Sequence, residues 1–191
     1  MGANAETSVV AANLMRQLQA WTPQDQPQES LRHDYLAFLD ARGDRALSRE
    51  ADRSHFTASC FVFTHDLTAV LLCFHKKGQF WVQLGGHIDV DDASVSAAAF
   101  REAVEEAGVA VTPASTRPLD VDRHRLGAGF RHCDVHWDVG FAAFADDTSA
   151  AVASDESEAV RWWPVAALPS AVPEGFPSRV ARIVTAVTAL V

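Results

Sequence analysis

Positive charge is scarce in this sequence. The 191 residues contain 16 Lys and Arg against 25 Asp and Glu, which gives a formal net charge of −9 at neutral pH. A protein that binds a nucleic-acid polymer needs a basic face for the phosphates, so we expect no such partner. A small phosphorylated substrate is compatible with this balance, because a divalent cation held by carboxylates reverses the local potential.

Cysteine and long apolar runs are also rare. The chain has only Cys60, Cys73 and Cys133, which are widely separated and have no zinc-ligand spacing, and we expect three reduced thiols. No apolar stretch reaches the roughly 20 residues that a membrane helix needs. The N-terminus lacks the basic and apolar segments of a signal peptide. These features predict a cytoplasmic protein with no membrane partner.

Two helices are predicted at the start of the chain. Residues 8–20 and 27–42 carry apolar side chains at helical spacing, and Gly43 provides the expected end of the second helix. We expect residues 1–50 to be an N-terminal helical extension that packs on a main domain of residues 51–191. This extension could close a substrate pocket or mediate a homodimer.

The remainder of the chain has the periodicity of strands that surround a central helix. The Ala-rich segment from Ser94 to Ala107 predicts that helix, and Gly108 is its expected end. A further helix is predicted over residues 178–190. Together these elements predict an α+β fold. The predicted strands cover residues 56–64, 68–75, 80–84, 118–125, 133–144 and 158–163.

Three glutamates of the central helix lie on one helix face. Glu102, Glu105 and Glu106 stand at positions i, i+3 and i+4. Like charges one turn apart destabilise an isolated helix by roughly 0.2–0.5 kcal/mol, and the dipole at this helix end favours cations. A bound divalent cation would remove both penalties. Oxygen ligands select magnesium, manganese or calcium rather than a thiol-seeking metal.

A glycine turn precedes this helix, and the two segments together resemble the Nudix box. The first part is GHIDVDD at residues 86–92, and the second is REAVEEAGV at residues 101–109, which matches the pattern REUxEExGU with U aliphatic. Residues 81–87 resemble the strand and turn that lead into the box. The sequence departs from the family pattern by one inserted residue between Gly86 and Arg101, and by Asp92 in place of the usual Glu.

The resemblance implies a Nudix-type α/β/α sandwich with a mixed sheet. It also implies a Mg²⁺-dependent hydrolase, with Mn²⁺ as the alternative ion. Such an enzyme cleaves the diphosphate linkage of a nucleoside diphosphate derivative or a related small molecule by water attack at phosphorus. Glu102, Glu105, Glu106 and the Gly86 carbonyl would hold the metal. Arg101 would be a structural brace.

The partner of that brace and the general base stay open at this point. Asp92, Asp91 or Asp89 could pair with Arg101. The base could be a box glutamate, Glu105 or Glu106, or it could be Glu156. The last of these lies in an acidic loop six residues before Trp162, a segment that resembles one common in the family.

Polar side chains alternate along the segment RHCDVHWDV. His132, Asp134, His136 and Asp138 would share one face of a strand. This face could contact a substrate or hold a second metal, or it could be an ordinary polar strand face. We predict His136 and Asp138 as substrate-binding residues, together with His87 in the glycine turn.

Two other functions occur on the same fold as alternatives to hydrolysis. A catalytically silent Nudix-fold module that binds nucleotides or regulates would have no need of three clustered carboxylates. An isoprenoid diphosphate isomerase on the same fold would need a Cys positioned for proton transfer, and the sequence does not place one.

Overall fold

A mixed β-sheet forms the centre of the structure, a computed structural model that describes residues 8–127, 133–146 and 157–190. Strands β1 and β7 run parallel over their full length, and the other strand pairs are antiparallel. The strands are β1 Ser54–Phe63, β2 Ala69–His75, β3 Phe80–Val82, β4 Leu84–His87, β5 Thr112–Pro113, β6 Asp120–Arg125, β7 Val135–Phe144 and β8 Ser157–Pro164.

Strand β1 has different neighbours along its two halves. Its first half pairs with β4, with Thr57 opposite His87, and its second half pairs with β2, with Val62 opposite Leu71. On its other side β1 pairs with β7, which brings His55 beside His136. The N-terminal ends of β1 and β7 therefore meet the C-terminal end of β4.

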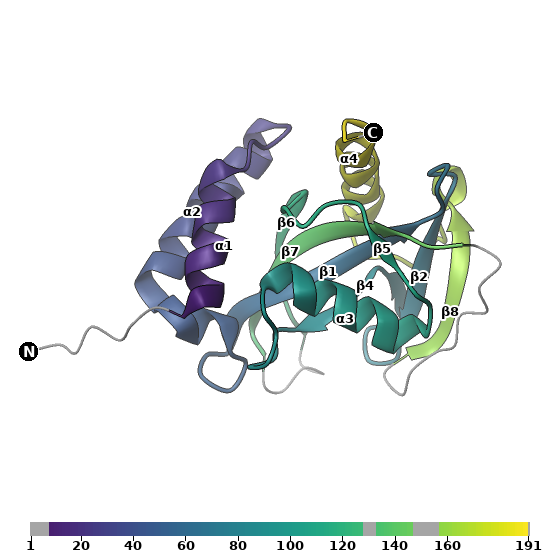
Figure 1. The fold of residues 1–191 in the computed structure, drawn as a ribbon. Coiled ribbons are helices and arrows are strands. Elements are labelled where there is room, and N and C mark those ends of the chain that lie inside the picture. The colour runs from purple at the N-terminus through teal and green to yellow at the C-terminus, as the bar shows by residue number, and fades with distance from the viewer. Residues whose placement is uncertain (1–7, 128–132, 147–156, 191) are drawn as a thin grey trace, which may run out of the picture.

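Helices cover both faces of the sheet (Figure 1). The helices α1, α2 and α3 share one apolar core with the inward side chains of β1 and β7, whereas α4 packs on a second core on the opposite face. This arrangement is the α/β/α sandwich that the resemblance implied. The helices are α1 Val9–Ala20, α2 Gln26–Arg42, α3 Val95–Ala107 and α4 Phe176–Thr188, with short 3₁₀ turns at Gly43–Leu47 and Val165–Ala167.

The expected α+β class with a mixed sheet and N-terminal helices is confirmed. The sequence was wrong about the segment 80–84, which divides into β3 and β4. Gly85 and Gly86 therefore lie within β4 and do not end a strand. Gly85 has φ +146°, and a Cβ there would lie 2.4 Å from the Ala58 carbonyl oxygen, so only glycine allows this pairing.

The aromatic side chains of α2 pack against the sheet. The Tyr35 hydroxyl donates to the backbone carbonyls of Asp122 and Asp138, and the Phe38 ring stacks on Trp137 with centroids 4.3 Å apart. These contacts place α2 as a cover over β6 and β7.

The division of the chain into two parts at residue 50 stays a prediction. Within the described ranges, no helix has the length and apolar composition that a membrane crossing requires.

Candidate active site

Helix α3 is fixed at both ends by residues that the sequence supplies locally. The Ser94 hydroxyl accepts a hydrogen bond from the Ala97 N–H at 3.1 Å, and Gly108 adopts the left-handed conformation at φ +66°. Ala98, Ala99 and other small residues are fully buried against β1 and β4. Small side chains let the helix approach the sheet closely, so its acidic end lies beside the glycines of β4.

The glycines of β4 touch the glutamates of α3 directly. A Cβ on Gly86 would lie 2.6 Å from the carboxyl carbon of Glu102 and within 2.8 Å of both its oxygens. The Gly85 N–H donates to Glu106 Oε2 at 2.9 Å, and Glu106 is only 7% exposed. Glu105, in contrast, has a side chain that is 59% exposed. A residue larger than glycine at position 86 would displace the Glu102 carboxylate.

Arg101 connects the loop to the helix. Its guanidinium donates two bonds to Asp92, at 2.9 and 3.0 Å, and one bond to the His87 carbonyl. The same group donates to Glu102 and Glu105, both at 2.9 Å. Hydrogen bonds from Arg101 hold the pKa of Asp92 below its usual range against the opposing effect of burial. Among the aspartates considered from sequence, Asp92 forms the bidentate pair, and Asp89 lies farther away at 3.6 Å.

The oxygen atoms of this region are the type of ligand that a hard divalent cation prefers. The region offers the carboxylates of Glu102, Glu105 and Glu106 beside the backbone of Gly86, and such oxygen donors suit Mg²⁺ and Mn²⁺. In the conformation shown, Arg101 bridges Glu102 and Glu105. Among the described residues, the side chains that lie close enough together to share one ion are not these glutamates. They are His55, His87, Cys133 and His136.

His87 and His136, predicted to bind substrate, lie together with their rings 5.4 Å apart. Burial lowers the pKa of His87 to about 4 and that of His136 to about 3, and neighbouring histidines contribute to both shifts. Both rings are therefore neutral near pH 7. The sequence missed the other two members of this group, His55 and Cys133. Strand pairing between distant segments brings them there, and no local pattern reveals it.

Asp138, the third residue predicted to bind substrate, lies in a buried ion-pair cluster. Its carboxylate accepts from the Thr57 hydroxyl at 2.9 Å and from Arg179 of α4 at 2.6 Å. The residue is 2% exposed, so it presents almost no surface to a ligand. Asp134 lies just before β7, exposed and paired with Arg53. The predictions for Glu156 and His132 fall outside the described residues.

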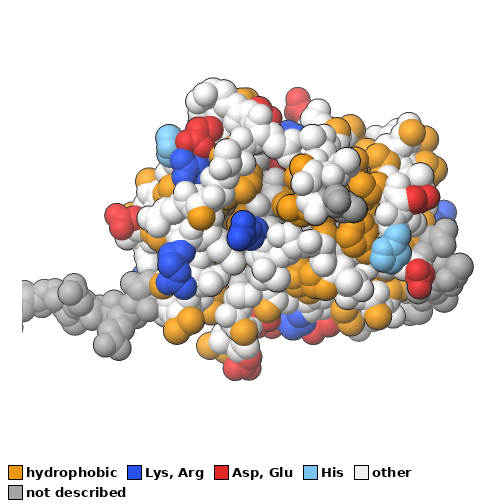
Figure 2. Space-filling model, turned by 45° about the horizontal axis from the view of Figure 1, so that its top comes forward, with side chains coloured by type: hydrophobic (Ala, Val, Ile, Leu, Met, Phe, Trp, Pro, Cys, Tyr) orange, Lys and Arg blue, Asp and Glu red, His pale blue; other side chains and the backbone are white. Residues whose placement is uncertain are grey.

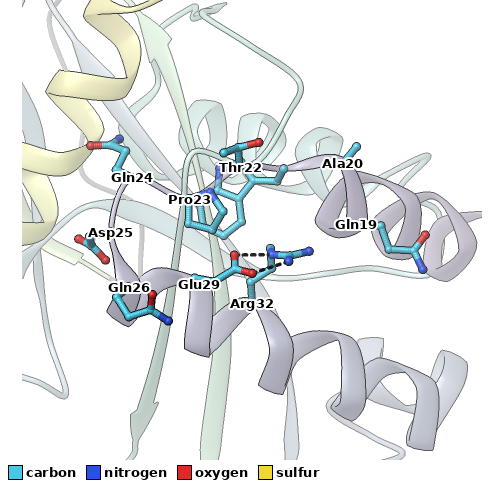
Figure 3. A pocket seen from close by; sticks show the side chains of 10 residues that line it. Gln19, Ala20, Thr22, Pro23, Gln24, Asp25, Gln26, Glu29 and Arg32 are labelled. Carbon is cyan, nitrogen blue, oxygen red and sulfur yellow. Dashed lines mark hydrogen bonds and ion pairs between the residues drawn. The ribbon is translucent and has the colours of Figure 1, made fainter.

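Two hollows in the surface lie away from the box. One, of about 550 Å³, lies at the turn between α1 and α2, where Figure 3 shows the Glu29–Arg32 ion pair on its floor. The second, of about 450 Å³, is lined by residues of β6 and β7, among them His124 and Trp137. On the face drawn in Figure 2, Lys and Arg stand singly among apolar and acidic side chains. The box glutamates line neither hollow.

Comparison with known proteins agrees with the box. The sequence model of the NUDIX domain matches residues 53–185. A solved structure of a NUDIX-family hydrolase from Clostridium perfringens is 26% identical, with a TM-score of 0.54, and the match covers 73% of this chain and 97% of that one. The comparison with curated proteins found no match.

Two more distant structures share the fold. A C. elegans Ap4A hydrolase in a binary complex is 15% identical with a TM-score of 0.56, over 70% of this chain and 98% of that one. The NUDIX domain of Shewanella oneidensis NrtR, complexed with ADP ribose, is 19% identical with a TM-score of 0.53, over 78% and 96%. The chain belongs to the Nudix family, and it is a hydrolase of that family.

Proposed function

We propose that this protein is a Mg²⁺-dependent enzyme that hydrolyses the diphosphate linkage of a nucleoside diphosphate derivative. Mn²⁺ is the alternative ion. The observation that carries the proposal is the Arg101 network, which holds the acidic end of α3 against the glycines of β4. A helix end with three acidic side chains is electrostatically unfavourable on its own. A cation bound by the carboxylates would offset this unfavourable electrostatic energy.

Each residue of the box then has a distinct task. Glu102, Glu105, Glu106 and the Gly86 carbonyl would hold the metal, and Asp92 would fix Arg101 as the brace of the loop. The metal, when bound, neutralises the diphosphate oxygens and lowers the pKa of water. The general base is one of three glutamates. Glu105 is the exposed candidate on α3, Glu106 is buried beside Gly85, and Glu156 is the candidate from the acidic loop.

The substrate is proposed at the level of its class. The NUDIX domain of NrtR was solved with ADP ribose, and another fold relative is named for its action on Ap4A. Both ligands contain a diphosphate linkage joined to a nucleoside, and we extend that class to this chain. The substrate contacts predicted for His87, His136 and Asp138 stay predictions. All three side chains have close protein neighbours.

A substrate screen tests the proposal. Full-length protein would be incubated with ADP ribose, Ap4A and nucleoside triphosphates, with Mg²⁺, with Mn²⁺ or with EDTA, and the products separated by anion-exchange chromatography. We expect turnover that requires the metal. Reaction in ¹⁸O-labelled water should place the label on a phosphate product, because water attacks phosphorus.

Three variants separate the metal ligands from the base. Loss of a ligand raises the Mg²⁺ concentration needed for half-maximal rate, whereas loss of the base lowers kcat and removes the acidic limb of its pH profile. Glu105→Gln, Glu106→Gln and Glu156→Gln are compared with Glu174→Gln, an exposed residue before α4 that should have no effect. Binding of these compounds without turnover, or turnover in EDTA, would overturn the proposal.

A further inference from the structure

Four side chains with metal-binding atoms meet where the ends of β1, β4 and β7 come together, and only His87 among them belongs to the box. They are His55, His87, Cys133 and His136, and one ligand atom from each lies within 4.8 Å of those of the others. His55 is fully buried, and the other three are partly buried. The donors are three imidazole nitrogens and one sulfur. This set differs in kind from the oxygen donors of α3.

Three separate strands bring these residues together. His55 on β1 stands directly beside His136 on the parallel strand β7. His87 ends β4 and pairs with Thr57, two residues further along β1 on the same sheet face as His55. Cys133 precedes β7, where the Asp134 N–H donates to the Arg53 carbonyl and fixes the approach of the chain. The site is therefore built on the rigid part of the fold.

The hydrogen bonds of His55 leave one ring nitrogen with a lone pair. Its Nδ1 lies 2.8 Å from the backbone carbonyl of Asp52, which can only accept, so Nδ1 carries the proton. The Nε2 atom is then unprotonated in the neutral ring, and it faces Cys133 Sγ at 3.9 Å. A backbone carbonyl that orients an imidazole in this way is the usual support of a histidine metal ligand.

His136 supplies a second, independent observation. Its Nε2 atom is buried and has no hydrogen-bond partner among the described residues. A buried polar atom without a hydrogen-bond partner lowers the stability of the folded state by roughly 1–3 kcal/mol, and such atoms are rare in native proteins. Burial also lowers the pKa values of His55 and His136, which keeps both rings neutral. Neutral imidazole is the form that binds metal.

The spacing of the ligand atoms suits a tetrahedral ion. Cys133 Sγ lies 3.8 Å from His87 Nε2 and 3.9 Å from His55 Nε2. In a tetrahedral zinc site, bonds of about 2.3 Å to sulfur and about 2.0 Å to nitrogen place these atoms about 3.6 Å apart. Arg49 approaches the far nitrogen of His87 at 3.5 Å, longer than a normal hydrogen bond, so it competes weakly for that ring.

We propose that His55, His87, Cys133 and His136 bind one zinc ion in a closed, structural site separate from the magnesium site of the box. Binding releases the thiol proton of Cys133 to solvent, and the thiolate becomes the fourth ligand. Four protein ligands leave no position for a reacting water. The ion ties β1, β4 and β7 together where the backbone of His87 also receives the Arg101 bond.

Metal content and a cobalt spectrum test this site in the full chain. The purified protein is loaded with Zn²⁺, dialysed, and its zinc measured by plasma mass spectrometry, and we expect one ion per chain. A second sample takes Co²⁺ instead. We expect the visible bands of tetrahedral cobalt and a thiolate-to-cobalt charge-transfer band. A protein that retains no zinc, or a cobalt complex without the thiolate band, would overturn the proposal.

Matched variants locate the ion. Cys133→Ser is nearly isosteric at a partly exposed position, so the variant should fold, and circular dichroism can verify this. It should weaken zinc binding by more than about 100-fold. Loss of a residue that only supports a ligand costs up to about 100-fold, so a larger effect identifies a ligand. His55→Gln should do the same, and His33→Gln on the exposed face of α2 is its control. The doubly substituted Glu105→Gln/Glu106→Gln protein should keep its zinc. Zinc lost from that protein but kept by Cys133→Ser would place the ion in the box and refute the site.

Discussion

Replacing Arg179 by Met tests whether α4 is held to the sheet by a buried ion-pair cluster. Arg179 is 5% exposed, and its guanidinium donates to Asp120 and to Asp138, which are 0% and 2% exposed. Arg182 donates to the other oxygen of Asp120 at 2.9 Å and would remain in the variant. Met keeps the volume of the side chain and removes only its charge and donors.

The expected loss can be worked from these partners. Removing one member of a buried ion pair costs about 3–5 kcal/mol, because a carboxylate is left buried without compensation. Asp120 keeps Arg182, whereas the one partner that the Asp138 carboxylate keeps among the described residues is the Thr57 hydroxyl. We therefore expect a loss near the lower end, about 3 kcal/mol of unfolding free energy. With a urea dependence of about 2 kcal/mol/M, the midpoint falls by about 1.5 M.

Urea denaturation followed by circular dichroism measures this loss. Arg117→Met, at an exposed loop position, should change stability by less than about 0.5 kcal/mol. Adding Asp138→Asn to Arg179→Met should recover part of the loss, because it removes the uncompensated charge. A loss below about 1 kcal/mol, or a double variant whose losses simply add, would refute the reasoning.

Two further changes test the box. Gly86→Ala should raise the Mg²⁺ concentration needed for half-maximal activity, because its Cβ would lie 2.6 Å from the Glu102 carboxyl carbon. The control is Gly127→Ala, where a Cβ meets no atom of the described residues within 4 Å, and an unchanged Mg²⁺ requirement in Gly86→Ala would contradict the contact. Arg101→Ala should lower the unfolding free energy most near neutral pH, and the difference from the unaltered protein should disappear below about pH 4. Arg101 lowers the pKa of Asp92, so its stabilisation is present above the ordinary carboxyl pKa and is lost as pH falls through the folded value; a gap in unfolding free energy that does not vary with pH would contradict this.

The sequence alone determined the parts of the protein that depend on near neighbours in the chain. Ser94 and Gly108 set the bounds of α3 through local capping, and the spacing of Glu102, Glu105 and Glu106 places them on one helix side. The same local pattern identified the family. The α+β class followed from the alternation of periodicities along the chain.

Only the tertiary structure decided which distant residues meet, because strand register brings together segments with no sequence relation. It selected Asp92 as the bidentate partner of Arg101, and it put Asp138 into the ion-pair cluster with Arg179 on α4. It also placed His87 and His136, both predicted to bind substrate, in a group with His55 and Cys133. The spacing of the cysteines gave no zinc motif, since three of the four ligands are histidines from three strands. Pairing of β1 with β4 and with β7 joins residues at least 24 positions apart and forms that group, and such pairing leaves no local pattern in the sequence.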